Sequence, residues 1–204
     1  MIDKTKSNSA FTLAEVLITL VIIGVVAALT IPNVIYNSKK HEYSARLKKF
    51  YSTMKQVQQR ADANGNGWRD FIDANVGVTG DNVAVSFIDE YLFPYLSFSK
   101  KDGSYIYLND GSSVRLNKST NCFQFYFDVN GDKKPNVAGR DIQVFEYCQS
   151  AYNGPKLTFG PYKRNNNLNS RADALTECTN GGITCSALLW FDGWEFKDDY
   201  PYRL

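Results

Sequence analysis

Residues 11–32 read FTLAEVLITLVIIGVVAALTIP, an apolar, helix-forming run whose one charged residue is Glu15. About 20 apolar residues suffice to span a bilayer as a helix, so this run predicts a membrane helix. A carboxylate at membrane depth costs on the order of 2.5–3.5 kcal/mol, and a chain that keeps one there usually holds a partner for it. We therefore expect Glu15 to meet a positive charge.

The motif AFTLAE at residues 10–15, with the apolar helix ending at Pro32, resembles the class III signal of type IV pilins and type II secretion pseudopilins. The resemblance implies that a prepilin peptidase cuts between Ala10 and Phe11 and methylates the new amine, giving N-methylphenylalanine. It also implies that Glu15 pairs with the Phe11 ammonium of a neighbouring subunit, because burying both charges together costs less than burying either alone. The family nearly always has Gly where this chain has Ala10. Alanine keeps the small volume but loses freedom at positive φ, so either cleavage is slower or the position tolerates alanine.

Two simpler interpretations of the same run compete with this one. A secretory signal peptide has a basic start, an apolar core and a small-residue cleavage site, which Lys4, Lys6 and residues 26–28 could supply. Glu15 would then fall inside the apolar core, where a signal peptide has no use for it. A plain single-pass anchor explains the length of the run but not the position of the acid. The pilin-type signal accounts for both.

Four segments follow from this interpretation. They are a cleaved leader at residues 1–10, a transmembrane or filament-core helix at 11–32, an amphipathic continuation at 33–63 and a globular head at 64–204. Pro32 predicts a kink or local unwinding, since proline lacks an N–H and clashes with the preceding turn. Beyond it, apolar residues recur at helical spacing on one stripe that we expect to pack on a sheet: Tyr36, Tyr43, Leu47, Phe50, Met54, Val57 and Ala61.

Composition narrows the function. The head has the length of one ordinary domain. The chain has 23 Lys and Arg against 21 Asp and Glu, a net charge of +2, so no nucleic-acid partner is predicted. His41 is the single histidine, which removes most acid-base and zinc chemistry. No enzyme activity is expected, and an extracytoplasmic hydrolase is disfavoured because the head lacks histidine and a G-x-S-x-G motif.

The four cysteines, Cys122, Cys148, Cys178 and Cys185, all lie in the expected head. An even number beyond an export segment predicts two disulfides in an oxidising compartment. Lys and Arg counts around the apolar run would instead place the head in the cytoplasm, and the cysteines outweigh them. Zinc is the competing use, but no C-x-x-C pair is present. Of the three possible connectivities we favour Cys122 with Cys148 and Cys178 with Cys185, since residues 122–128 and 142–148 look like paired strands.

The fold class expected is α+β. Residues 105–108 and 113–116 predict a hairpin around Asp110-Gly111, because this dipeptide supplies positive φ. With the two cysteine-bearing strands this makes an antiparallel sheet of about four strands. A short helix is expected within residues 82–97, broken at Pro94. A long N-terminal helix packed on such a sheet is the pilin fold.

Oxygen-bearing side chains alternate along residues 128–141, at Asp128, Asn130, Asp132 and Asn136. Calcium prefers six to eight oxygen ligands from a short turn, so this loop is a candidate calcium site, although it lacks the features of an EF-hand. The run is similar to a DVNG…PN…G-D stretch of many pilin-like heads. A hairpin loop whose side chains satisfy its own amides is the alternative. No other cofactor is expected.

The tail, residues 190–202, combines aromatic and acidic residues. Such a run suits carbohydrate stacking or docking to another subunit, but we favour a terminal strand whose aromatics cover the sheet edge.

Together these features predict a structural subunit that polymerises into a periplasmic or surface filament of a type II secretion or type IV pilus system. The resemblance implies, as partners, copies of the chain, other pilins or pseudopilins, prepilin peptidase, an inner-membrane assembly platform and membrane lipid. The subunit is expected first as a single-pass inner-membrane protein with an extracytoplasmic head, then as part of a filament. The alternative is a membrane-anchored or secreted extracytoplasmic binding module without a filament role.

Overall fold

The computed structural model describes residues 11–65, 67–149, 158–163 and 168–204. The expected leader and its cleavage residue Ala10 lie outside the described residues. The chain forms two compact units, Met1–Lys39 and Lys40–Leu204. One helix, α1 (Leu13–Ala63), supplies residues to both units.

In the first unit, the part of α1 at residues 13–39 is called the stem. All the Leu, Ile and Val side chains between Leu13 and Ile35 are 46–79% exposed. The helix runs through Pro32 without interruption, so the expected local unwinding is not seen. A kink at Pro32 stays a prediction. The helix ends where predicted, with Gly65 in the left-handed region at a φ of 78°.

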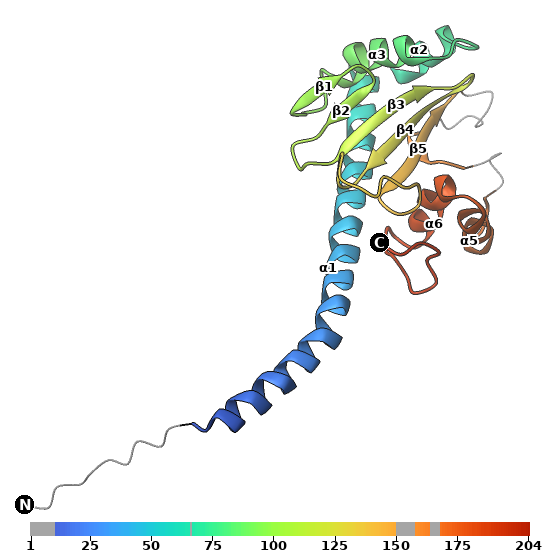
Figure 1. Cartoon of the computed structure of the whole chain (residues 1–204). Helices are drawn as coiled ribbons and strands as arrows, with labels where there is room; N and C mark the ends of the chain where they lie inside the picture. The colour runs from blue at the N-terminus through green and yellow to red at the C-terminus, as the bar shows by residue number, and fades with distance from the viewer. Residues whose placement is uncertain (1–10, 66, 150–157, 164–167) are drawn as a thin grey trace, which may run out of the picture. The chain divides into compact units, whose positions relative to one another are not determined.

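The second unit is built on a six-stranded antiparallel sheet in the order β1-β2-β3-β4-β5-β6 (Figure 1). Its strands are β1 (Lys100–Asp102), β2 (Tyr105–Tyr107), β3 (Ser113–Lys118), β4 (Cys122–Asp128), β5 (Ile142–Cys148) and β6 (Gly160–Pro161). The four central strands are those expected from the sequence. β1 and β6 are two- or three-residue additions at the edges. The α+β class and the helix-on-sheet arrangement are confirmed.

The core lies between one face of the sheet and residues 43–61 of α1. Alternate strand residues, including Phe123, Phe125 and Phe127, point to this face and are fully buried or nearly so. Phe50 of α1 stacks on Phe127 with ring centroids 4.1 Å apart. The predicted stripe from Leu47 to Ala61 is buried here, which confirms that it is a packing face. Burying side chains of this size stabilises the head by about 1.5–3 kcal/mol each.

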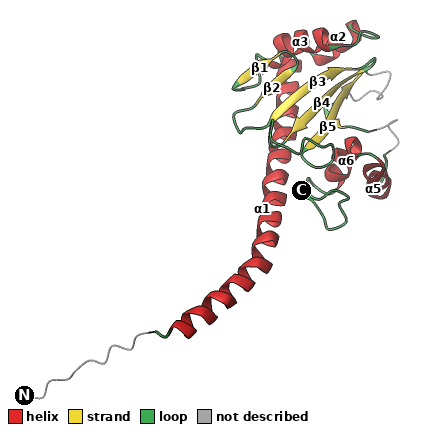
Figure 2. Cartoon of the chain, viewed as in Figure 1, coloured by secondary structure: helices red, strands yellow, loops and turns green. Residues whose placement is uncertain are grey.

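Shorter helices complete the head (Figures 1 and 2). Two near the end of α1 are α2 (Trp68–Ala74) and α3 (Asp81–Phe87), the second continuing into a π-helical turn, η1 (Ile88–Leu92). After the sheet come α5 (Arg171–Asn180), a 3-10 turn, η3 (Gly182–Thr184), and α6 (Cys185–Phe191). The helix expected within residues 82–97 is present and ends before Pro94.

The expected terminal strand in residues 190–202 is wrong. The first of these residues end helix α6, and the remainder is turn and coil. The reason is packing: Ala187, Leu188 and Leu189 are buried around one helix instead of alternating as in a strand. Trp194 still covers the core, with its ring 4.8 Å from that of Tyr51.

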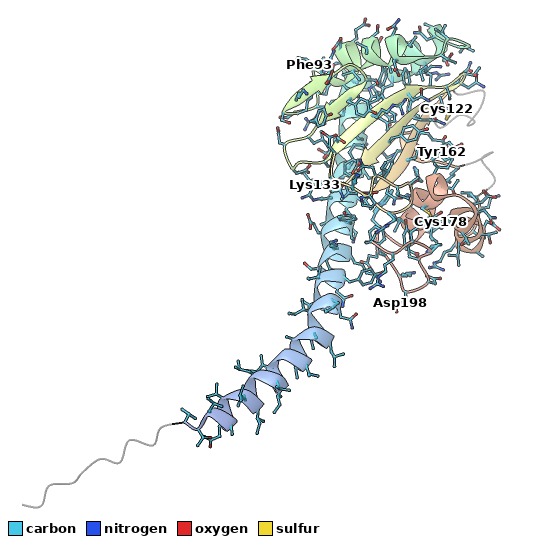
Figure 3. The ribbon with its side chains drawn as sticks, viewed as in Figure 1. Phe93, Cys122, Lys133, Tyr162, Cys178 and Asp198 are labelled. Carbon is cyan, nitrogen blue, oxygen red and sulfur yellow. A yellow bond between two sulfur atoms is a disulfide. The ribbon has the colours of Figure 1, made fainter. Side chains whose placement is uncertain are left out.

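Two disulfides join Cys122 to Cys148 and Cys178 to Cys185, the pairing placed first from the sequence. The first links directly opposed residues of β4 and β5. The second closes a turn between α5 and α6. Figure 3 places Cys122 at the end of the sheet away from Lys133, and Cys178 among the C-terminal helices.

Candidate functional site

The start of α1 forms a capping box. The Thr12 backbone N–H and hydroxyl both donate to Glu15 Oε2, each at 2.8 Å, and the Glu15 N–H donates to Thr12 Oγ1 at 3.3 Å. This reciprocal arrangement satisfies two N–H groups that a helix N-terminus leaves without partners. The signal T-x-x-E was present in the sequence. Glu15 therefore has a local role in addition to the predicted pairing with Phe11, which stays a prediction.

The Leu, Ile and Val side chains of the stem are all exposed in the described structure. α1 is long and apolar enough in this part to cross a membrane, judged by length and composition. Phe11, the expected first residue of the processed chain, is 87% exposed. Gly24 and Ala28 lie one helical turn apart on the stem, and a Cβ built on Gly24 would meet no atom within 4 Å apart from the adjoining helix backbone. Such small residues allow close approach of a second helix in a membrane or filament core.

The segment from Asp128 to Asp141, called the acidic loop, is organised by Asp141. Its carboxylate accepts the backbone N–H groups of Asn136 at 2.8 Å and Val137 at 2.7 Å, and the side-chain amide of Asn130 at 3.3 Å. Asp141 is 1% exposed. The sequence analysis included Asp141 in this loop but not among the candidate calcium ligands, and its hydrogen bonds now identify it as the centre of the loop.

Helix α1 fixes the acidic loop in place. Tyr43 accepts a hydrogen bond from the Asn130 side chain at 3.2 Å. Arg46 donates from one nitrogen to the carbonyl oxygens of Asp110 and Val129, both at 2.9 Å. The guanidinium thus ties α1 to the acidic loop and to the β2–β3 turn at once.

Three of the four predicted calcium ligands, Asp128, Asp132 and Asn136, line one pocket of about 240 Å³ on the sheet. Asn130 does not line this pocket, and its side-chain nitrogen faces Tyr43 and Asp141. Its oxygen is buried and has no hydrogen-bond partner among the described residues. An oxygen of this kind suits a hard cation, so the donor set fits calcium in type while being spread over two sides of the loop.

The electrostatics of the loop favour a cation. Burial, with a smaller contribution from the nearby carboxylates of Asp141 and Asp132, raises the pKa of Asp128 to about 7, although the backbone N–H groups of Asn130 and Gly131 oppose the shift. A carboxyl in this state holds a proton in place of a missing positive charge. Calcium binding by the loop nevertheless stays a prediction.

The same pocket contains residues that the sequence analysis missed. Arg115 of β3 lies between Tyr105 of β2 and Tyr126 of β4, with its guanidinium carbon 5.9 Å from each ring centroid. The register brings them together, since Tyr105 opposes Arg115 and Arg115 opposes Tyr126. No local pattern could reveal this group, because its members come from three strands. We call the cavity the sheet-face pocket.

The acidic side chains of the tail form ion pairs within the head. Arg171 of α5 holds Asp192 and Asp199 with paired hydrogen bonds of 2.6–2.9 Å. Lys40 of α1 reaches Asp198 at 3.6 Å. The adjacent carboxylates of Asp198 and Asp199 therefore face different partners, Lys40 and Arg171.

Comparison with known families agrees with the geometry of the N-terminus. Residues 5–31 match the prokaryotic N-terminal methylation motif. With its long apolar helix, the chain is a pilin- or pseudopilin-type protein carrying a prepilin signal and a membrane-anchoring segment. Residues 33–204 match a family of unknown function (DUF6613), and the chain belongs to that family. No curated protein and no solved structure matches the chain.

Proposed function

We propose that this chain is a structural subunit that polymerises into a filament of a type II secretion or type IV pilus system. The observation that carries the proposal is the methylation motif followed by a stem whose Leu, Ile and Val side chains are all exposed. Such a surface requires a covering, first lipid and then the stems of other subunits. Subunit contacts that do not close on themselves give an open helical filament.

Moving the stem from lipid into a filament core changes its surroundings little, because lipid tails are as apolar as leucine. Close packing and polar contacts must therefore provide the driving force. Leader removal creates an ammonium at Phe11, and pairing it with Glu15 of a neighbour relieves the cost of a carboxylate at membrane depth. The stem offers Gly24 and Ala28 as positions for close helix contact. Processing thus controls assembly.

The head is proposed to lie outside the cytoplasm, anchored by the single span before assembly. Two disulfides support this location, since such bonds persist in oxidising compartments. The proposed partners are other copies, related pilins or pseudopilins, prepilin peptidase and an inner-membrane platform. A motor ATPase elsewhere would supply energy, because the chain has no G-x-x-x-x-G-K-[ST] motif.

A fractionation experiment tests the proposal. Tagged full-length chain is expressed with its own assembly system, and sheared filaments are separated from membranes. Ala10→Leu, which enlarges the cleavage residue, is expected to keep the chain in the membrane. Ala10→Gly, the matched control, should process at least as well as the unaltered chain. Filaments that form without this chain would favour the anchored binding module instead, and filaments that contain it with its leader intact would contradict the control of assembly by processing.

We further propose calcium as the ion of the acidic loop, supported by its carboxylates and by the buried oxygen of Asn130. Ligands that bind the native state raise its melting temperature. Thermal unfolding in calcium and in chelator should therefore differ for the unaltered chain. The difference should vanish in Asp132→Asn, and equal melting temperatures in both solutions would contradict calcium binding.

A further inference from the structure

We propose that the sheet-face pocket binds a neutral carbohydrate group. The pocket lies where the exposed face of β2, β3 and β4 meets the acidic loop, and its volume is about 240 Å³. This suits one sugar ring. Its lining sets two tyrosine rings beside polar side chains, so a ligand would meet both an aromatic wall and hydrogen-bonding groups.

The charges in the pocket select the class of ligand. Arg115 lines one part, while Asp128 and Asp132 line another. An organic anion large enough to fill the pocket would meet the two acids, and an organic cation of that size would meet the guanidinium. A neutral ligand that both donates and accepts hydrogen bonds satisfies all three side chains at once. Hydroxyl groups on neighbouring carbons of a sugar have this property.

The shapes of the polar groups match a sugar as well. Arg115 presents a planar fork of donors, and the carboxylate of Asp132 and the amide of Asn136 are planar pairs that bridge adjacent hydroxyls. Asp128 is 8% exposed and forms a buried polar element of the pocket. Its Oδ1 accepts the Asn130 N–H at 3.1 Å, which fixes the carboxyl group in position.

The aromatic wall comes from Tyr105 and Tyr126. Tyr105 is 40% exposed, so its ring is accessible. The Tyr126 hydroxyl donates to Gln124 Oε1 at 3.1 Å, which holds that ring in place. The C–H-rich face of a sugar can pack on such rings, while its hydroxyls reach the polar groups beside them. The Tyr126 ring is thus held in position before a ligand binds, which reduces the entropic cost of binding.

The neighbouring elements leave this face of the sheet open. Val144 on β5, which opposes Tyr126, is 1% exposed, and Ser186 of α6 hydrogen-bonds to its carbonyl oxygen. The C-terminal helices therefore cover β5, whereas Arg115 on β3 remains exposed. On this face of the sheet, β5 is therefore a packing surface, whereas the part around Arg115 is open to a ligand.

The test is saturation-transfer NMR on the full chain in a phosphocholine detergent, which has no sugar head group, with chelator present. The probes are glucose, galactose, N-acetylglucosamine and N-acetylgalactosamine, compared with arginine and citrate. We expect transfer to at least one sugar and none to arginine or citrate. Arg115→Lys and Tyr105→Ala should each weaken binding about tenfold or more, the scale of one lost charge-assisted hydrogen bond.

Tyr107→Ala is the matched control, because Tyr107 lies on the same strand but does not line the pocket. It should bind the sugar as the unaltered chain does. Near-ultraviolet circular dichroism must show the same head fold in all variants. The proposal would be overturned if none of the four sugars binds, or if arginine or citrate binds in preference to them. It would also be overturned if Arg115→Lys and Tyr105→Ala bind the sugar as well as the unaltered chain does. Filament assembly is measured separately and does not depend on these outcomes.

Discussion

Glu15 has two roles that three substitutions can separate. Its carboxylate accepts two hydrogen bonds from Thr12 within the capping box, and we propose that it also pairs with the processed Phe11 of a neighbour. Glu15→Gln keeps a side-chain acceptor for the capping box but removes the charge. Thr12→Ala removes the hydroxyl from the capping box and keeps the charge. Glu15→Ala removes both.

The magnitudes differ enough to be decisive. Loss of an N-cap side chain costs about 0.5–2 kcal/mol. An unpaired carboxylate at membrane depth costs about 2.5–3.5 kcal/mol, and pairing in the filament relieves this cost in the unaltered chain. Glu15→Gln has no such cost to relieve, so its preference for the filament over the membrane should fall roughly a hundredfold. The preference of Thr12→Ala for the filament should fall less, because this variant loses only the helix cap.

The assay measures the chain in sheared filaments and in membranes by immunoblot. Membrane insertion should be intact in all three variants, and incorporation should be poor in Glu15→Gln and Glu15→Ala. If Glu15→Gln assembles as well as the unaltered chain while Thr12→Ala does not, the charge pairing is refuted and the capping role alone remains.

Three further predictions concern the head and are read by thermal unfolding. Gly182→Ala should destabilise the head by roughly 3 kcal/mol, because the added Cβ would lie 2.1 Å from the Ala138 carbonyl oxygen. Gly160→Ala is the control and should cost far less, because the nearest atom to its Cβ, the Thr158 carbonyl oxygen, is 3.9 Å away. Equal losses of stability in the two variants would contradict this. Lys118→Met should cost about 1–3 kcal/mol, since the buried ammonium donates to the carbonyl oxygens of residues 78, 119 and 120, and an unchanged melting temperature would exclude this role. Burial raises the pKa values of Asp128 and Glu146 to about 7. The stability that these two groups contribute in chelator should therefore be highest below about pH 4 and should fall as the pH rises to 7. The double substitution Asp128→Asn with Glu146→Gln should flatten this fall, and an unaltered pH profile would disprove the prediction.

The central strands could be predicted because their residue types indicate strands and their cysteines indicate the register. The run from Cys122 to Asp128 is rich in aromatic residues, and its counterpart from Ile142 to Cys148 has a cysteine at the matching end. Pairing the cysteines fixes the register of every residue between them. The long helix was equally clear, since its apolar residues first fill all sides and then form one stripe.

The edge strands could not be predicted, because their residues carry no strand preference. β1 is Lys-Lys-Asp, and β6 is Gly-Pro. Only pairing with an existing neighbour makes such segments strands. Helix α5 did have a signal, since Ser170 caps the N–H of Asp173 in an S-x-x-D pattern. Residues 190–202 were mistaken for a strand because a short apolar run fits both structures, whereas Trp190 and Phe191 end helix α6.

The candidate sites divide in the same way. The residues of the N-terminal motif are consecutive, so their spacing alone shows the signal. Arg115 and its two tyrosines come from three strands, and only the sheet register makes them neighbours. Asp141 is separated from Asp128 by a long loop, so its central position required the folded backbone.

Mass spectrometry of the mature N-terminus tests the central claim most directly. Chain recovered from the native host should begin at Phe11 and carry one methyl group on its α-amine. A chain that retains Met1 to Ala10, or one that begins near Leu29 as after signal peptidase cleavage, would contradict assembly through a processed prepilin signal.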